Sequence, residues 1–120
     1  MASQENQSNS SVIEAQLIHI TLILPLFNRY RNFYEVEYKP EEAEVFLRER
    51  IEKNESKIFL AMQGDTPIGF TQLYPSFSSL SMKRVWILND LYVEEDYRKH
   101  GVGKMLLDAA KEFAIQTKSK

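Results

Sequence analysis

A strand that ends in a glycine-containing turn and is followed at once by a helix constrains the fold of this chain most strongly. Residues 83–93 form a strand-length run rich in apolar and β-branched side chains, and from Val102 onward apolar residues recur at three- and four-residue spacing. Gly101 and Gly103, two of the four glycines in the chain, stand where the turn leads into this helical pattern. A strand that leads into a helix is the repeating unit of α/β domains. We therefore predict an α/β fold with a central strand over 83–93 and a terminal helix.

The segments before residue 83 fit the same fold class. Helical spacing predicts helices over about 17–34 and 40–54, although Pro25 should bend the first helix or delay its start. Further strands are expected at 12–16, 57–63 and 68–74, with a hairpin turn over 64–67 and a serine-rich loop over 75–82. The predicted order is a strand, two helices, three strands and a helix, which gives a mixed β-sheet flanked by helices.

The last predicted helix has no strand after it. A helix that crosses over from a strand normally leads to a parallel partner strand, and none follows within the 120 residues. We therefore expect a domain that is truncated at its C-terminus.

The length and charge of the chain limit its organisation and partners. With 120 residues and a mass of 14.1 kDa, a second domain of ordinary size would not fit beside the first. Residues 1–11 are polar, so we expect a disordered tail there and a single domain over 12–120. The 15 basic and 17 acidic residues give a net charge of -2, which provides no broad basic face for a nucleic-acid backbone. We expect no nucleic-acid partner.

Missing residue types and segments exclude other classes of function. The chain has no cysteine, which excludes disulfides, thiolate nucleophiles and sulfur-ligated metals, and His19 and His100 are too far apart to suggest a metal cluster. The first residues show no basic and apolar leader, and the longest apolar stretch is interrupted by Pro25 before it reaches the roughly 18–20 residues of a membrane span. The expected location is the cytoplasm, with no membrane partner.

The turn over residues 98–104 is typical of a phosphate site. The first N–H groups of a helix have no partner within the helix and carry partial positive charge, and glycine lets a ligand approach the backbone closely. Arg98, Lys99 and Lys104 add cationic side chains around the same turn, which favours a diphosphate. Neither the nucleotide P-loop pattern nor the third glycine of a dinucleotide fingerprint is present. The alternative interpretation is a plain turn before a helix.

The sequence of this region resembles that of a known family. RKHGVG at 98–103 fits the pattern Arg/Gln-x-x-Gly-x-Gly/Ala and follows the strand end LYV at 91–93, which together resemble the cofactor-binding core of the GCN5-related N-acetyltransferases (GNAT). The resemblance covers about 88–110 at motif level and implies acetyl-CoA as cofactor. It implies that the pantetheine arm pairs with the backbone of Leu91, Tyr92 and Val93. It implies a pyrophosphate-binding turn made of Arg98, Lys99, His100, Gly101, Val102, Gly103 and Lys104.

Catalysis also needs a group that removes a proton from the acceptor. An amine with a pKa of about 10.4 is protonated at neutral pH and must lose a proton before it attacks a thioester. The NDLYV…YR sequence resembles the diamine-acetylating branch of the family, in which a glutamate precedes the strand aspartate. In this chain Asn89 occupies that position, and its amide cannot accept a proton. Asp90 is our candidate base, directly or through water. The alternatives are a base elsewhere and a structural hydrogen-bonding role for Asp90. The family's general acid, a tyrosine on a later helix, has no counterpart in the sequence.

These observations predict an acetyl-CoA-dependent N-acetyltransferase that acts on a primary amine of a small molecule or peptide. The alternative is a truncated or degenerate module that binds CoA weakly or serves only in protein–protein interaction. The expected free edge of the central strand and the uncovered face of the last helix also suggest a possible homodimer.

Overall fold

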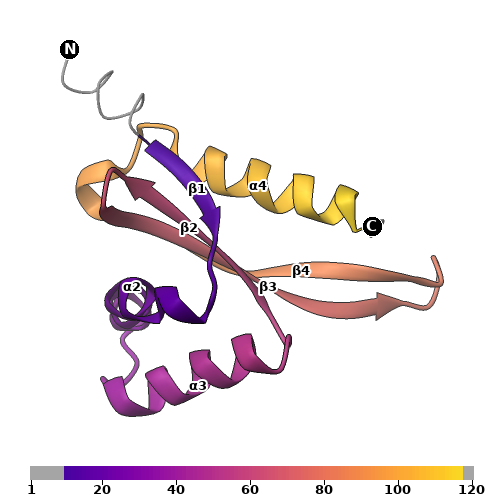
Figure 1. The fold of residues 1–120 in the computed structure, drawn as a ribbon, viewed down its shortest axis with the longest axis horizontal. Coiled ribbons are helices and arrows are strands. Elements are labelled where there is room, and N and C mark those ends of the chain that lie inside the picture. Colours follow the sequence, from indigo (N-terminus) through magenta and orange to yellow (C-terminus); the bar gives the residue numbers. More distant parts are fainter. Residues whose placement is uncertain (1–9, 118–120) are drawn as a thin grey trace.

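The computed structural model describes residues 10–117, and its elements follow the predicted order (Figure 1). The strands are β1 (Ser10–Glu14), β2 (Lys57–Gln63), β3 (Thr66–Ser78) and β4 (Lys83–Val93). The helices are α2 (Ile20–Phe33), α3 (Pro40–Glu52) and α4 (Val102–Gln116), with short 3₁₀ turns η1 (Leu17–His19) and η2 (Glu95–Tyr97). The α/β fold class with a sheet flanked by helices is confirmed. Among the described residues, no helix is both long enough and apolar enough to span a bilayer.

The four described strands form one sheet in the order β1-β2-β3-β4. Each of its three pairings is antiparallel, whereas a mixed sheet was expected from the sequence. Ser10 and Ser11 pair with Gln63 and Met62, so these two residues belong to β1 and not to the expected tail. The remainder of that predicted tail, 1–9, lies outside the described residues.

Helices cover both faces of the sheet (Figure 1). On one face, α2 and α3 bury apolar side chains such as Ile23, Leu26 and Leu47 against Leu60 and Phe70 of the strands. On the other face, α4 packs residues that include Val102, Leu106 and Ala110 against Phe59, Ala61, Ile68 and Leu73. The alternation of side chains along each strand supplies both faces, because neighbouring residues point to opposite sides.

Pro25 lies inside α2 without ending it. Proline removes the hydrogen bond to the carbonyl of residue i−4, which is Thr21 here. Thr21 is exposed and Pro25 is at the surface, so water can solvate that carbonyl. The helix consequently continues through the proline. It begins at Ile20, after η1 and three residues later than its apolar spacing suggests.

Strands β3 and β4 continue well past the rest of the sheet. The last pair between β2 and β3 is Lys57 with Leu73, but β3 and β4 remain paired to Ser78 and Lys83. The predicted loop over 75–82 was wrong for its first four residues, which are strand. Pro75 is tolerated in this strand because β3 has no partner on its other side there, as is usual for proline in an edge position. The extension forms a two-stranded arm that projects from the body (Figure 1).

Candidate functional site

A β-bulge divides β4 just before its functional end. Gln72 pairs with Asp90 and the next residue of β3, Leu73, pairs with Leu88, which leaves Asn89 as an extra residue without a partner in the ladder. The bulge reverses which side chains face which helix layer. Before it, Trp86 packs with the α4 layer, whereas beyond it Tyr92 packs with the α2 layer.

The end of β4 presents part of its backbone to an unpaired edge. β4 is one of the two edge strands of the described sheet, and the amide of Glu94 donates to the carbonyl of Ile68 at 2.8 Å. Because inward and outward backbone groups alternate in an antiparallel pair, the amides and carbonyls of Leu91 and Val93 point away from β3. Those of Tyr92 point toward β3 instead. Two of the three residues predicted to pair with pantetheine therefore have backbone groups at the edge.

The Asp90 carboxylate lies at the bulge, and the residue is 5% exposed. Its Oδ1 accepts hydrogen bonds from the Tyr30 hydroxyl at 2.8 Å and from Asn89 Nδ2 at 2.9 Å. Its Oδ2 accepts one from Gln72 Nε2 at 2.7 Å. Asn89 and Asp90 thus bring their side chains together despite being neighbours in a strand, which the bulge allows. The contacts with Tyr30 and Gln72 were missed in the sequence, because these residues stand 60 and 18 positions before Asp90.

Two tyrosines near Asp90 hold their protons tightly. Burial raises the pKa of Tyr30 above its ordinary value, and the hydrogen bond to Asp90 raises it further. Burial also raises the pKa of Tyr74 to about 12, with Asp90 adding to the shift. Both hydroxyls are therefore neutral at physiological pH and act there as hydrogen-bonding groups.

The turn after β4 has the backbone geometry that the glycines suggest. Gly101 adopts φ 84°, a left-handed conformation that glycine tolerates well, and it caps α4. No side chain caps this helix, and the first helical bond runs from the Met105 amide to the Gly101 carbonyl at 3.0 Å. The amides of Val102, Gly103 and Lys104 consequently have no acceptor four residues before them. Lys99 also adopts a positive φ, 68°.

Gly103 leaves open space beside the start of α4. A Cβ atom built at this position would meet no heavy atom of another residue within 4 Å. Packing within the protein therefore does not require glycine at 103. The space lies next to the unpartnered amides, where a ligand that approaches the backbone would need it. The turn thus fits an anion such as a diphosphate.

The side chains of the turn are arranged differently from the sequence expectation. Arg98 Nε donates to the carbonyl of Val93 at 2.7 Å, and its guanidinium group lies over the rings of Tyr92 and Phe33. Arg98 therefore holds the turn against the end of β4. The Lys104 ammonium bonds to Asp108 at 2.9 Å on the solvent side of α4. His100 is half-buried.

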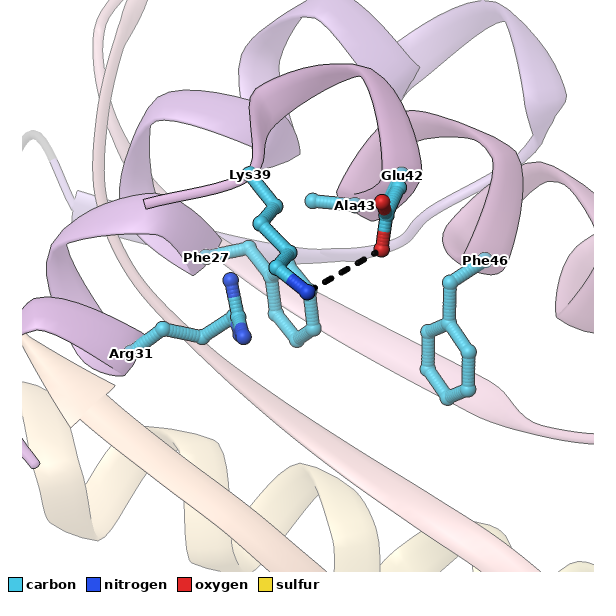
Figure 2. A pocket seen from close by; sticks show the side chains of 6 residues that line it. All are labelled: Phe27, Arg31, Lys39, Glu42, Ala43 and Phe46. Atoms are coloured by element: carbon cyan, nitrogen blue, oxygen red, sulfur yellow. Dashed lines mark ion pairs between the residues drawn. The ribbon is translucent and has the colours of Figure 1, made fainter. Parts of the chain in front are cut away.

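A separate pocket of about 320 Å³ lies between α2 and α3 (Figure 2). The rings of Phe27 and Phe46 are nearly parallel, with centroids 6.2 Å apart, and Lys39 Nζ lies 3.8 Å from Glu42 Oε2. None of the residues predicted to bind the cofactor lines this pocket.

Comparison with known proteins identifies the family of the chain. The model of the acetyltransferase (GNAT) family matches residues 23–119. The chain belongs to the GNAT family. Among its GNAT relatives is an uncharacterised N-acetyltransferase of Bacillus subtilis, YhfO, which is 47% identical over 110 residues, or 92% of this chain and 74% of the relative. A probable acetyltransferase of Haemophilus influenzae is 36% identical over 109 residues, covering 90% of this chain and 75% of the relative.

A solved structure of a GNAT-like protein shares the fold as well as the sequence. The crystal structure of a probable acetyltransferase is 48% identical, superposes with a TM-score of 0.85, and is matched over 91% of this chain and 74% of its own. The protein is accordingly an acetyltransferase of the GNAT type.

Proposed function

We propose that the chain is an acetyl-CoA-dependent N-acetyltransferase that transfers the acetyl group to a primary amine of a small molecule or peptide. The observation that carries this proposal is the start of α4, where three backbone amides lack helical acceptors beside the open space at Gly103. The GNAT family uses acetyl-CoA, and the thioester of this cofactor supplies an activated acetyl group. The amides of Val102, Gly103 and Lys104 would bind the pyrophosphate, because helix N-termini favour anions.

The edge of β4 supports the second half of the proposed cofactor site. Backbone groups of Leu91 and Val93 point outward, but the Val93 carbonyl already accepts a bond from Arg98. The Leu91 backbone and the Val93 amide therefore remain as partners for the pantetheine arm. An N–H at this edge also suits a developing oxyanion, since a fixed backbone donor needs no reorganisation during the reaction.

We assign the base to Asp90, acting through Tyr30. The carboxylate is too buried for direct contact with a bulky acceptor, but the Tyr30 hydroxyl donates to it at 2.8 Å. In this relay the amine passes a proton to Tyr30 Oη while the phenolic proton moves to Asp90 Oδ1. The raised pKa of Tyr30 suits the relay because the hydroxyl remains protonated before and after the transfer.

The acceptor would approach from the α2 side of β4. The exposed Tyr34 ring lies 5.3 Å from the Tyr30 ring, and aromatic faces attract ammonium groups. Diamines are one candidate class within the primary amines, because the NDLYV…YR wording resembles that branch.

A paired binding and turnover experiment tests the proposed function. Calorimetric titration with acetyl-CoA and with CoA should show binding to the wild type and none to Gly103→Glu, which places a negative side chain at the amides. Lys111→Glu places a glutamate at an exposed position farther along α4 and should bind normally. Release of the CoA thiol in the presence of spermidine, or of a peptide with alanine at its N-terminus, then measures catalysis. Binding without release with any primary amine would favour the non-catalytic module, and no binding by the wild type would refute the proposal.

A further inference from the structure

The arm made by β3 and β4 exposes apolar side chains at its end. Phe77 is 74% exposed, Leu80 99% and Met82 88%, and Lys83 and Arg84 follow directly. We call these five residues the arm tip. A two-stranded hairpin is only marginally stable alone in water, and exposed apolar groups at its end gain stability when a partner covers them. The arm tip contains two cations and no acidic residue.

A groove of opposite charge lies on the outer side of α3. It has a volume of about 320 Å³ and is lined by Glu41, Glu42, Val45, Phe46 and Glu49, which we call the acidic groove. Its floor is apolar, with Val45 56% and Phe46 37% exposed, and its three charged lining residues are all acidic, although the Arg50 guanidinium lies 4.8 Å from the centroid of the Phe46 ring. Glu42 pairs with Lys39 at 3.8 Å and Glu49 accepts a hydrogen bond from Lys53 at 3.3 Å, and both ion pairs are exposed. No ion pair is found for Glu41 among the described residues.

The arm tip and the acidic groove cannot meet within one molecule. The arm projects from one end of the sheet, whereas α3 lies beneath the body (Figure 1). Phe46 and Glu42 also line the pocket between α2 and α3 (Figure 2), so the groove and that pocket share two residues. A second copy of the chain carries the matching surface.

We propose that two copies form a symmetric dimer in which the arm tip of each occupies the acidic groove of the other. Leu80 and Met82 cover Val45 and Phe46. Lys83 and Arg84 leave opposite sides of the arm, because they are neighbours in β4, and they face glutamates on the two rims of the groove; Arg84 also lies over the Phe77 ring. A two-fold axis makes this contact twice, which gives a closed assembly instead of a fibre. The complementary charges fix the orientation of the two copies. This inference is independent of the proposed enzymatic function.

Sedimentation equilibrium of the full chain tests the dimer. The wild type should show twice the 14.1 kDa mass of one chain, and raising the salt concentration should weaken the association because the rim charges are exposed. Lys83→Glu with Arg84→Glu, or Glu41→Lys with Glu49→Lys, should each raise the dimer dissociation constant at least about tenfold, since each places like charges opposite one another. The four substitutions together should restore association.

Control variants distinguish this dimer from association through another surface. Leu80→Ser alters an almost fully exposed side chain, so it should leave the circular dichroism spectrum unchanged while weakening the dimer. Lys111→Glu on α4 should have no effect on association. A wild type that remains monomeric at millimolar concentration would overturn the proposal. A dimer that resists the groove substitutions would also overturn it, because another surface would then receive the arm.

Discussion

Gly103→Ala should raise stability and keep CoA affinity, because the pattern Arg/Gln-x-x-Gly-x-Gly/Ala accepts alanine at this position, whereas Gly103→Leu should lower CoA affinity. A Cβ at position 103 meets nothing within 4 Å, so the methyl group fits the protein without strain. Replacing glycine by alanine at a compatible helical position stabilises a protein by about 0.4–1 kcal/mol, chiefly by restricting the unfolded chain. At about 2.1 cal/mol/K per residue, the unfolding entropy of a chain this size makes that gain about 2–4 °C in Tm.

The larger side chain of Gly103→Leu should obstruct a diphosphate held against the backbone. Displacing the ligand from one amide removes a hydrogen bond to a charged group, which contributes about 1.5–3 kcal/mol. The dissociation constant of Gly103→Leu for CoA should therefore rise roughly 10- to 150-fold. Differential scanning fluorimetry measures the first effect, and calorimetric titration with CoA measures the second.

Gly64→Ala provides the matched control, because the hairpin glycine also has open space but a positive φ of 59°. That variant should lose about 1–2 kcal/mol of stability and keep wild-type CoA affinity. The reasoning would be refuted if Gly103→Leu bound CoA as tightly as the wild type, or if Gly103→Ala melted at a lower temperature.

Further predictions concern the cluster around Asp90. Asp90→Asn and Tyr30→Phe should each lower kcat by roughly 10²–10⁴-fold with an unchanged KM for acetyl-CoA. The double variant should be no slower than the slower single variant, because both residues belong to one relay. Additive losses of kcat in stopped-flow assays would contradict the relay. Folding keeps the Tyr74 proton bound to a higher pH than the unfolded chain does, so stability is full below about pH 10 and falls as pH rises toward 12. Tyr74→Phe should reduce this alkaline loss in urea titrations at pH 9 and 11; an identical loss in both proteins would exclude Tyr74 as its source.

Local patterns in the sequence predicted the parts of the fold that depend on neighbouring residues. Hydrophobic spacing located the three helices that the structure describes, and the two glycines located the turn that precedes α4. The arm was missed because four serines and Pro75 are typical of a loop, whereas pairing with β4 holds residues 75–78 extended. Composition alone does not reveal a partner strand.

The candidate site was predicted less completely than the fold. Backbone positions in the turn followed from glycine chemistry, but the contact of Arg98 with the Val93 carbonyl depends on how the turn folds back on β4. The partners of Asp90 come from α2 and β3, 60 and 18 residues away. Such contacts arise from tertiary packing and leave no periodic signal in the sequence.

The single unpaired residue at Asn89 has a consequence for comparing sequences. Before Asn89, even-numbered side chains of β4 point to one face of the sheet, and after it they point to the other face. A relative that lacks this extra residue would therefore align correctly on only one side of it. Transferring functional assignments across that point without a gap would swap residues that meet the acceptor with residues buried beneath the last helix. A one-residue misalignment there would assign catalytic or binding roles to residues that only pack in the core.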